Sequence, residues 1–117
     1  KGFWIYKFEP QSLYQYLKNT DCEERDFDFE LRYPLNMSYR FILNFHKDLL
    51  VFDDFKIIEG EVFYFEEKIE QISSKSIQID YVLNLKADRI KATDYKKTCD
   101  QFNSIAEELP LLIYFAK

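Results

Sequence analysis

Residues Leu35 to Phe45 read LNMSYRFILNF, and this stretch decides the fold. Apolar or aromatic residues stand at every second position from Leu35 onward, and the positions between them are mostly polar. Successive side chains of a strand point to opposite faces of the sheet, so the alternation directs one set into a core and the other toward solvent. A helix would scatter the same apolar residues around its circumference. The stretch therefore predicts a long β-strand.

Further strands surround this one. Ser76 to Leu85 alternates just as regularly, and Glu61 to Ile72 alternates apolar with charged residues. The turn Ser73-Ser74-Lys75 joins these two stretches, which predicts an antiparallel hairpin. Shorter strands bounded by turn-forming residues are predicted at Phe3 to Phe8, Phe27 to Leu31, Leu49 to Phe52 and Phe55 to Ile58.

Two helices interrupt the strands. Pro10 to Lys18 opens with a proline, which fits the first turn of a helix. From about Thr93 to Leu109, apolar residues recur at steps of three and four, which predicts a helix with one face on the sheet. Thr93 suits its N-cap, and Asp94 suits the dipole of its first turn. Leu111 to Phe115 predicts a last strand, either buried on both faces or completing a sheet edge.

Together these elements predict one mainly β domain over residues 1–117. Its expected architecture is an antiparallel β-sandwich of about 6–8 strands, with one short N-terminal helix and one C-terminal helix packed on the sheet. A strand and a short helix lead in over residues 1–24, and residues 25–117 form the sandwich with the C-terminal helix. The length of 117 residues fits one such domain.

Composition and motifs argue against several functions. The net charge of −5 disfavours nucleic acid as a partner, and no apolar run approaches the roughly 20 residues that cross a bilayer, so no membrane insertion is predicted. The single histidine, His46, has no nucleophile motif beside it, and Gly2 and Gly60 stand apart rather than in a phosphate-binding loop. The acidic residues between Asp21 and Glu30 alternate with apolar ones, which is typical of a solvated strand face rather than a calcium loop. We therefore expect no catalytic residues, no cofactor and no metal.

Two features leave alternatives open. Cys22 and Cys99 lie far apart in the sequence and form no metal or redox motif, so they are either a disulfide or two free cysteines. Aromatic residues make up 19% of the chain, and some of them must reach the surface. They form either a ligand-binding platform or part of an aromatic core. The candidate ligand contacts are Trp4, Tyr6, Tyr14 and Tyr16.

From Arg25 onward the chain resembles the C-terminal β-sandwich domain of bacterial transglutaminase-like proteins that begin with a β-rich domain of unknown function. The residues that carry the resemblance are Arg25, Leu31, Pro34, the stretch Leu35 to Phe45, Asp88, Ile90, Asp94, Tyr95, Phe102 and Leu111-Leu112-Ile113. A Leu-Pro-Gly-like turn usually follows the long strand in that family, and Phe45-His46-Lys47-Asp48 stands in its place here.

The resemblance implies a non-catalytic accessory domain of a periplasmic or extracellular bacterial protein. Its partner would be a papain-like catalytic domain upstream in the same polypeptide, so no catalytic residue falls on this chain. The start at Lys1 without a methionine fits a piece of a longer protein. The alternative hypothesis is a free-standing extracellular binding module for a protein or glycan.

Overall fold

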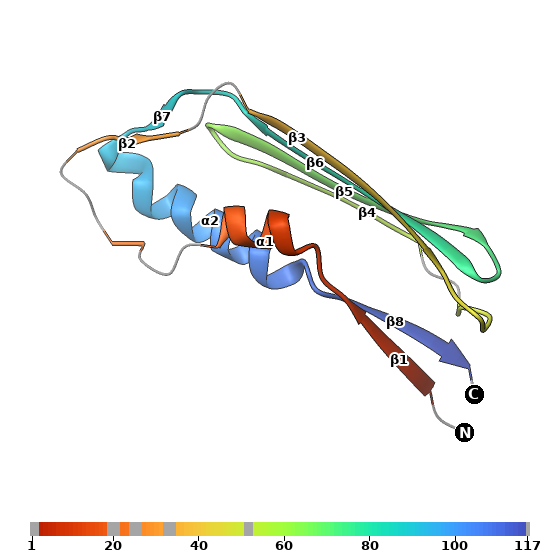
Figure 1. The fold of residues 1–117 in the computed structure, drawn as a ribbon. Coiled ribbons are helices and arrows are strands. Elements are labelled where there is room, and N and C mark those ends of the chain that lie inside the picture. Colours follow the sequence, from red (N-terminus) through yellow and green to blue (C-terminus); the bar gives the residue numbers. More distant parts are fainter. Residues whose placement is uncertain (1–2, 19–21, 24–26, 32–34, 51–52, 117) are drawn as a thin grey trace.

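A four-stranded antiparallel sheet forms one layer of the molecule (Figure 1). The computed structural model describes residues 3–18, 22–23, 27–31, 35–50 and 53–116. In spatial order, the sheet consists of β3 (Asn36–Asn44), β6 (Ser76–Leu85), β5 (Phe63–Ser73) and β4 (Asp54–Glu59). The predicted hairpin is confirmed as β5 and β6, joined by a turn at Ser74 and Lys75.

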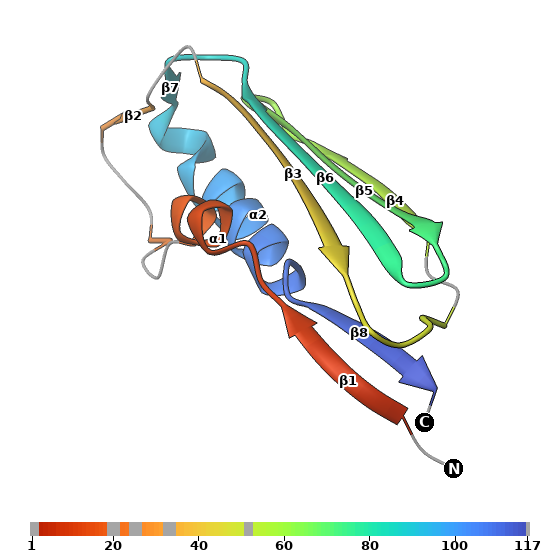
Figure 2. The same cartoon turned by 45° about the vertical axis from the view of Figure 1, so that its right-hand side comes forward.

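The alternation predicted for these strands is confirmed by their burial. Every second side chain of β6 is buried, and those between are partly exposed. The inward-facing residues of β5 and β6 form the largest part of the core, including Phe63, Phe65, Ile79 and Leu83. The outward-facing residues form a sheet face that no described helix or strand covers (Figure 2). The sheet is thus one-sided, as antiparallel sheets commonly are.

Helices and a strand pair form the second layer. α1 (Gln11–Leu17) buries Leu13 and Leu17, and α2 (Tyr95–Glu108) lies beside it under the inner face of the sheet (Figures 1 and 2). β1 (Phe3–Phe8) pairs antiparallel with β8 (Leu111–Ala116). The ring of Phe8 contacts Phe41 of β3, and that of Phe115 contacts Phe45, just after β3. The chain is mainly β with a short N-terminal and a C-terminal helix, as predicted.

The helix bounds differ slightly from those predicted. A 3₁₀ turn, Ala92–Asp94, precedes α2, so the predicted N-cap role of Thr93 is wrong. Asp94 occupies the N-cap position instead, and its side chain makes no capping hydrogen bond. The backbone N–H of Asp94 donates to the carbonyl of Lys91, so the chain is already turning before the α-helix begins.

The outcomes of the shorter strand predictions differ. The strand predicted at Phe27 to Leu31 is reduced to β2 (Phe29–Glu30), which pairs with β7 (Arg89–Ile90). Within Leu49 to Phe52, Leu49 makes an isolated bridge to Phe115, and residues 51–52 lie outside the described residues. β8 is not buried on both faces, since Leu112 is 43% exposed; it completes a two-stranded sheet.

A disulfide joins Cys22 to Cys99, whose Cα atoms lie 5.5 Å apart. Cys99 is buried on α2 beside Tyr95 and Ile90, in a small cluster separate from the main core. Asn103, one turn further along α2, donates a hydrogen bond to the Sγ of Cys22 at 3.1 Å. The bond therefore fastens the segment after α1 to the first half of α2.

Candidate functional site

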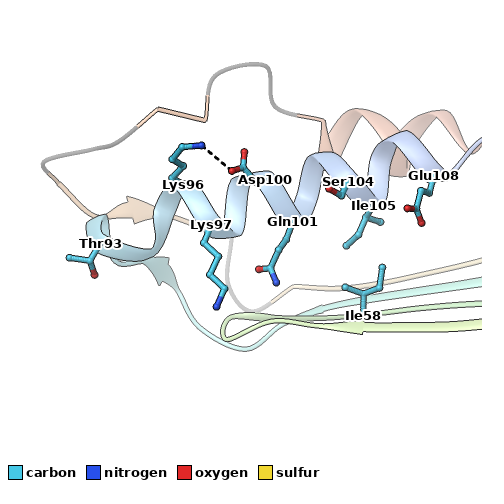
Figure 3. Close-up of a pocket in the computed structure, with 9 residues that line it drawn as sticks. All are labelled: Ile58, Thr93, Lys96, Lys97, Asp100, Gln101, Ser104, Ile105 and Glu108. Atoms are coloured by element: carbon cyan, nitrogen blue, oxygen red, sulfur yellow. Dashed lines mark hydrogen bonds and ion pairs between the residues drawn. The ribbon is translucent and has the colours of Figure 1, made fainter.

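An open groove lies between α2 and β4. Its volume is about 630 Å³. Figure 3 shows the groove, with Ile58 of β4 on one side and a row of α2 side chains on the other. The residues that line it are Ile58, Thr93, Lys96, Lys97, Asp100, Gln101, Ser104, Ile105 and Glu108.

The helical repeat explains why α2 presents this row. Lys97, Gln101, Ser104 and Glu108 follow one another at steps of three and four, so they lie along one side of the helix. The neighbouring side carries Phe102, Ile105 and Ala106 into the core and holds the helix against the sheet. The polar row is therefore left beside the sheet edge, at the mouth of the groove.

Apolar side chains form the floor. Ile105 is 2% exposed, and Ile58 is partly buried against the main core. Ile58 faces inward because it stands opposite Phe65 in the β4–β5 ladder. The groove thus offers an apolar strip flanked by polar groups, the usual composition of a protein-binding or ligand-binding site.

Ion pairs fix the charges along the groove. Lys96 Nζ lies 3.1 Å from Asp100 Oδ2 within α2, four residues apart. At the other end, Lys56 Nζ of β4 lies 2.9 Å from Glu108 Oε1 of α2. This second pair links the strand to the last turn of the helix, so it closes the groove at that end. Lys97 makes no ion pair with another residue that the structure describes, and it extends across the groove toward the sheet (Figure 3).

Glu67 is a buried carboxylate next to this closure. It is 5% exposed and occupies an inward position of β5, between Phe65 and Ile69. Burial raises the pKa of Glu67 above the ordinary carboxyl value, and the positive charge of Lys56 opposes that rise. The Lys56 pKa is raised as well: burial alone would lower it, but the hydrogen bond to Glu108 and the charge of Glu67 outweigh that effect.

Tyr81 of β6 stands on the other side of Glu67 in the sheet. Its side chain is fully buried, and burial together with the Glu67 charge raises the pKa of the hydroxyl. The carboxylate lies near enough to act on that pKa, but the two groups do not meet in hydrogen-bond geometry, and the hydroxyl has no hydrogen-bond partner among the described residues. Lys56, Glu67 and Tyr81 thus form a polar row across three strands of the inner face.

The four predicted ligand-contact aromatics do not form one surface. Tyr6 is 45% exposed and lines a second hollow of about 280 Å³ with Phe45, His46 and Phe115. Tyr14 and Tyr16 are partly buried on α1 and pack against the main core. Trp4 lies on β1 opposite Phe115, and its side chain lies outside the described residues. Ligand contact by any of these residues stays a prediction.

The described part of the chain shows no arrangement of metal ligands. It holds no group of three or more histidine, cysteine or acidic side chains that could bind a metal ion. His46 is exposed in the turn after β3. Asp28, from the acidic stretch, instead accepts a hydrogen bond from the backbone N–H of Ala92 and holds β2 beside β7.

The groove and the Glu67 row were not among the sequence predictions. One signal for Glu67 was present in the sequence. Phe63, Phe65 and Ile69 occupy alternate positions, and Glu67 stands at the position of the same set between Phe65 and Ile69. An acidic residue at an inward position indicates a buried charge. The groove left no such signal, because it depends on where α2 lies relative to the sheet edge.

Comparisons with known proteins give no relative. No family model matches the chain, and neither the curated proteins nor the solved structures include a similar one. No described helix is long and apolar enough to cross a membrane. The resemblance to the C-terminal domain of transglutaminase-like proteins therefore stays a prediction that rests on the quoted residues alone.

Proposed function

We propose that this chain is a non-catalytic binding domain that holds an extended segment of a partner protein in the groove between α2 and β4. One observation carries the proposal: the groove borders an edge strand, whose Ile58 lines it. Among the described strands, β4 pairs only with β5, so its outer edge is open to one more strand. An extended peptide added there forms backbone hydrogen bonds to β4 and places alternate side chains in the groove.

The lining of the groove defines the partner segment. The strip of Ile58 and Ile105 accepts an apolar side chain. Lys97, near the beginning of α2, attracts an acidic side chain of the segment. Glu108 is engaged by Lys56 and leaves no comparable attraction for a basic side chain at the other end. An apolar and acidic extended segment fits these features.

The disulfide is relevant to the location of the protein. Disulfides persist where the environment is oxidising, which favours an extracellular or periplasmic location. In the accessory role implied by the family resemblance, the partner segment would come from an upstream catalytic domain of the same polypeptide. In a free-standing binding module, it would come from another protein. The groove serves either arrangement.

Selection from a random peptide library displayed on phage tests the proposal. The disulfide-bonded domain is the bait, and enriched peptides are synthesised and measured by calorimetry. Ser104→Trp fills the groove from an exposed helix position, and we expect it to weaken binding about tenfold or more. Glu107→Trp is the matched control, because Glu107 is exposed on α2 and does not line the groove.

Two further measurements address the mode of binding. Alternate amides of an extended peptide point to opposite edges, and a strand pairs along one edge only. N-methylation of the amides on the pairing edge should therefore abolish binding, and N-methylation of those on the other edge should leave binding intact. Amide shifts on titration should concentrate in β4 and α2. Equal binding by the two tryptophan variants, or shifts confined to the hollow beside Tyr6, would show that the groove is not the site.

A further inference from the structure

β3 is the other edge strand of the sheet, and its outer edge is unpaired within the described residues (Figure 2). It runs for nine residues, Asn36–Asn44, in continuous register with β6 and without a bulge. Each of these residues has a backbone N–H and C=O, and roughly half of those groups point away from β6. β3 therefore presents a long, regular edge that can accept another strand.

Natural sheets protect such edges, and β3 lacks the usual protection. Proline, bulges and inward-pointing charges are the common devices. β3 contains neither proline nor glycine, and its one charged residue, Arg40, points outward and donates to Asp80 at 2.8 Å. β4, by contrast, is shorter and borders the groove beside α2. The two edges of one sheet thus differ in length and in what lies next to them.

The core is also incomplete along β3. The inward-facing residues of β6 are buried, whereas those of β3 are only half-buried. They pack against the main core on one side and remain open on the other. The half-buried residues are Met37, Tyr39, Phe41 and Leu43. A strand added beside β3 would cover them and continue the apolar layer.

We propose that β3 pairs antiparallel with β3 of a second copy of this chain, giving a continuous eight-stranded sheet with its two-fold axis at Phe41. An axis at Arg40 would place two guanidinium groups opposite each other, which is unfavourable. An axis at Phe41 pairs the two Phe41 rings and sets Tyr39 against Leu43. Such an isologous contact is the commonest form of dimer.

The position of Ile42 favours this register over its neighbour. Ile42 is the most exposed apolar residue of β3, at 51%. With the axis at Phe41, Ile42 lies beside the axis and packs on the methylene stem of Arg40 from the second copy. With the axis at Tyr39, it would lie near the end of the ladder, opposite Asn36. The first register buries more apolar surface.

Charge substitutions at Ile42 test the pairing and its register together. Sedimentation equilibrium of the disulfide-bonded protein should show a reversible monomer–dimer equilibrium. Ile42→Glu places a carboxylate against each Arg40 of the other copy, and we expect the dimer to tighten about tenfold. Ile42→Lys places like charges there, and we expect it to weaken by a similar factor. Arg40 can donate hydrogen bonds to both Asp80 and the new carboxylate, because its guanidinium has five N–H groups.

Ile57 supplies the matched control. It lies on the outer face of β4 and is 48% exposed, so Ile57→Glu and Ile57→Lys make the same changes on the other edge strand. We expect both to leave the dissociation constant of the dimer unchanged. Circular dichroism should confirm that all four variants fold. A monomer at every concentration would overturn the self-pairing and assign the edge to a different strand. Equal effects at Ile42 and Ile57, or no opposite effect of the two charges at Ile42, would overturn it as well.

Discussion

Lys56 lies directly opposite Glu67 in the ladder of β4 and β5, and its ammonium nitrogen is 3.9 Å from the Glu67 carboxylate. The same nitrogen is 2.9 Å from Glu108 of α2. One lysine thus faces a buried carboxylate of the sheet and an exposed carboxylate of the helix. The shorter contact is with the exposed group, so Glu67 is only partly compensated for its burial.

The pH dependence of stability should reflect this partial compensation. Because the pKa of Glu67 is higher in the folded than in the unfolded protein, its contribution to stability is present at low pH and is lost as the pH rises. The loss begins near the ordinary carboxyl pKa of 4.5 and ends above the folded value. Glu67→Gln should remove this loss and make the protein more stable than wild type at neutral pH.

Urea denaturation at several pH values measures the difference. The difference in the free energy of unfolding between Glu67→Gln and wild type should be smallest near pH 4 and should increase as the pH rises. Glu70→Gln is the control, since Glu70 lies on the same strand and is exposed. A Glu67→Gln protein that loses stability at neutral pH would mean that the contact with Lys56 outweighs the burial.

Tyr81→Phe should not destabilise the protein. The Tyr81 hydroxyl is buried without a hydrogen-bond partner in the described structure, and such a group is unfavourable in a core. Removing it should stabilise the fold by about 1 kcal/mol. Tyr39→Phe, at the half-buried neighbour on β3, is the control. A marked destabilisation by Tyr81→Phe, measured by denaturant midpoint, would reveal a hydrogen bond to Glu67.

Gly60→Ala should destabilise the turn between β4 and β5. A Cβ on Gly60 would lie 2.8 Å from Cδ1 of Phe63, whose fully buried ring packs edge-on against Phe102 at 4.9 Å between centroids. The ring cannot move without disturbing that contact, so we expect a loss of about 1–3 kcal/mol. In a Phe63→Leu background the same change should cost less, and a double-mutant cycle measures the coupling. Additive effects would mean that the ring does not restrict Gly60.

The disulfide should contribute about 4 kcal/mol. It closes a loop of 77 residues, and the loss of chain entropy in the unfolded state rises with loop length. A Cys22→Ser, Cys99→Ser double variant should show this decrease in the free energy of unfolding, measured in urea without reductant. The wild type after reduction should match the variant. Equal stability of the oxidised and reduced wild type would contradict the expectation.

The sequence predicts the strands of this protein better than it predicts the contacts between its elements. Leu35 to Phe45 and Ser76 to Leu85 were predicted correctly because each alternates over its whole length, and burial enforces that pattern on one face. Thr93 was misassigned because a 3₁₀ turn and an α-helix share similar local signals.

The contacts between elements could not be predicted. The Lys56–Glu67–Tyr81 row depends on the register of three strands, which no single strand encodes. The groove depends on the position of α2 over the sheet, and the disulfide on the loop that follows α1. Sequence spacing leaves all three undetermined, because each joins segments that are far apart along the chain.

The pairing of β1 with β8 has a mechanical consequence. Phe3 stands opposite Ala116, so the beginning of β1 and the end of β8 lie side by side (Figure 1). Tension applied between those ends breaks the hydrogen bonds of this ladder one after another, because they lie parallel to the applied force. Once the ladder has opened, the load passes from Cys22 to Cys99 through the covalent bond. The four-stranded sheet lies within the loop that the disulfide closes, so its strands stay outside the path of the tension while the ends are drawn apart.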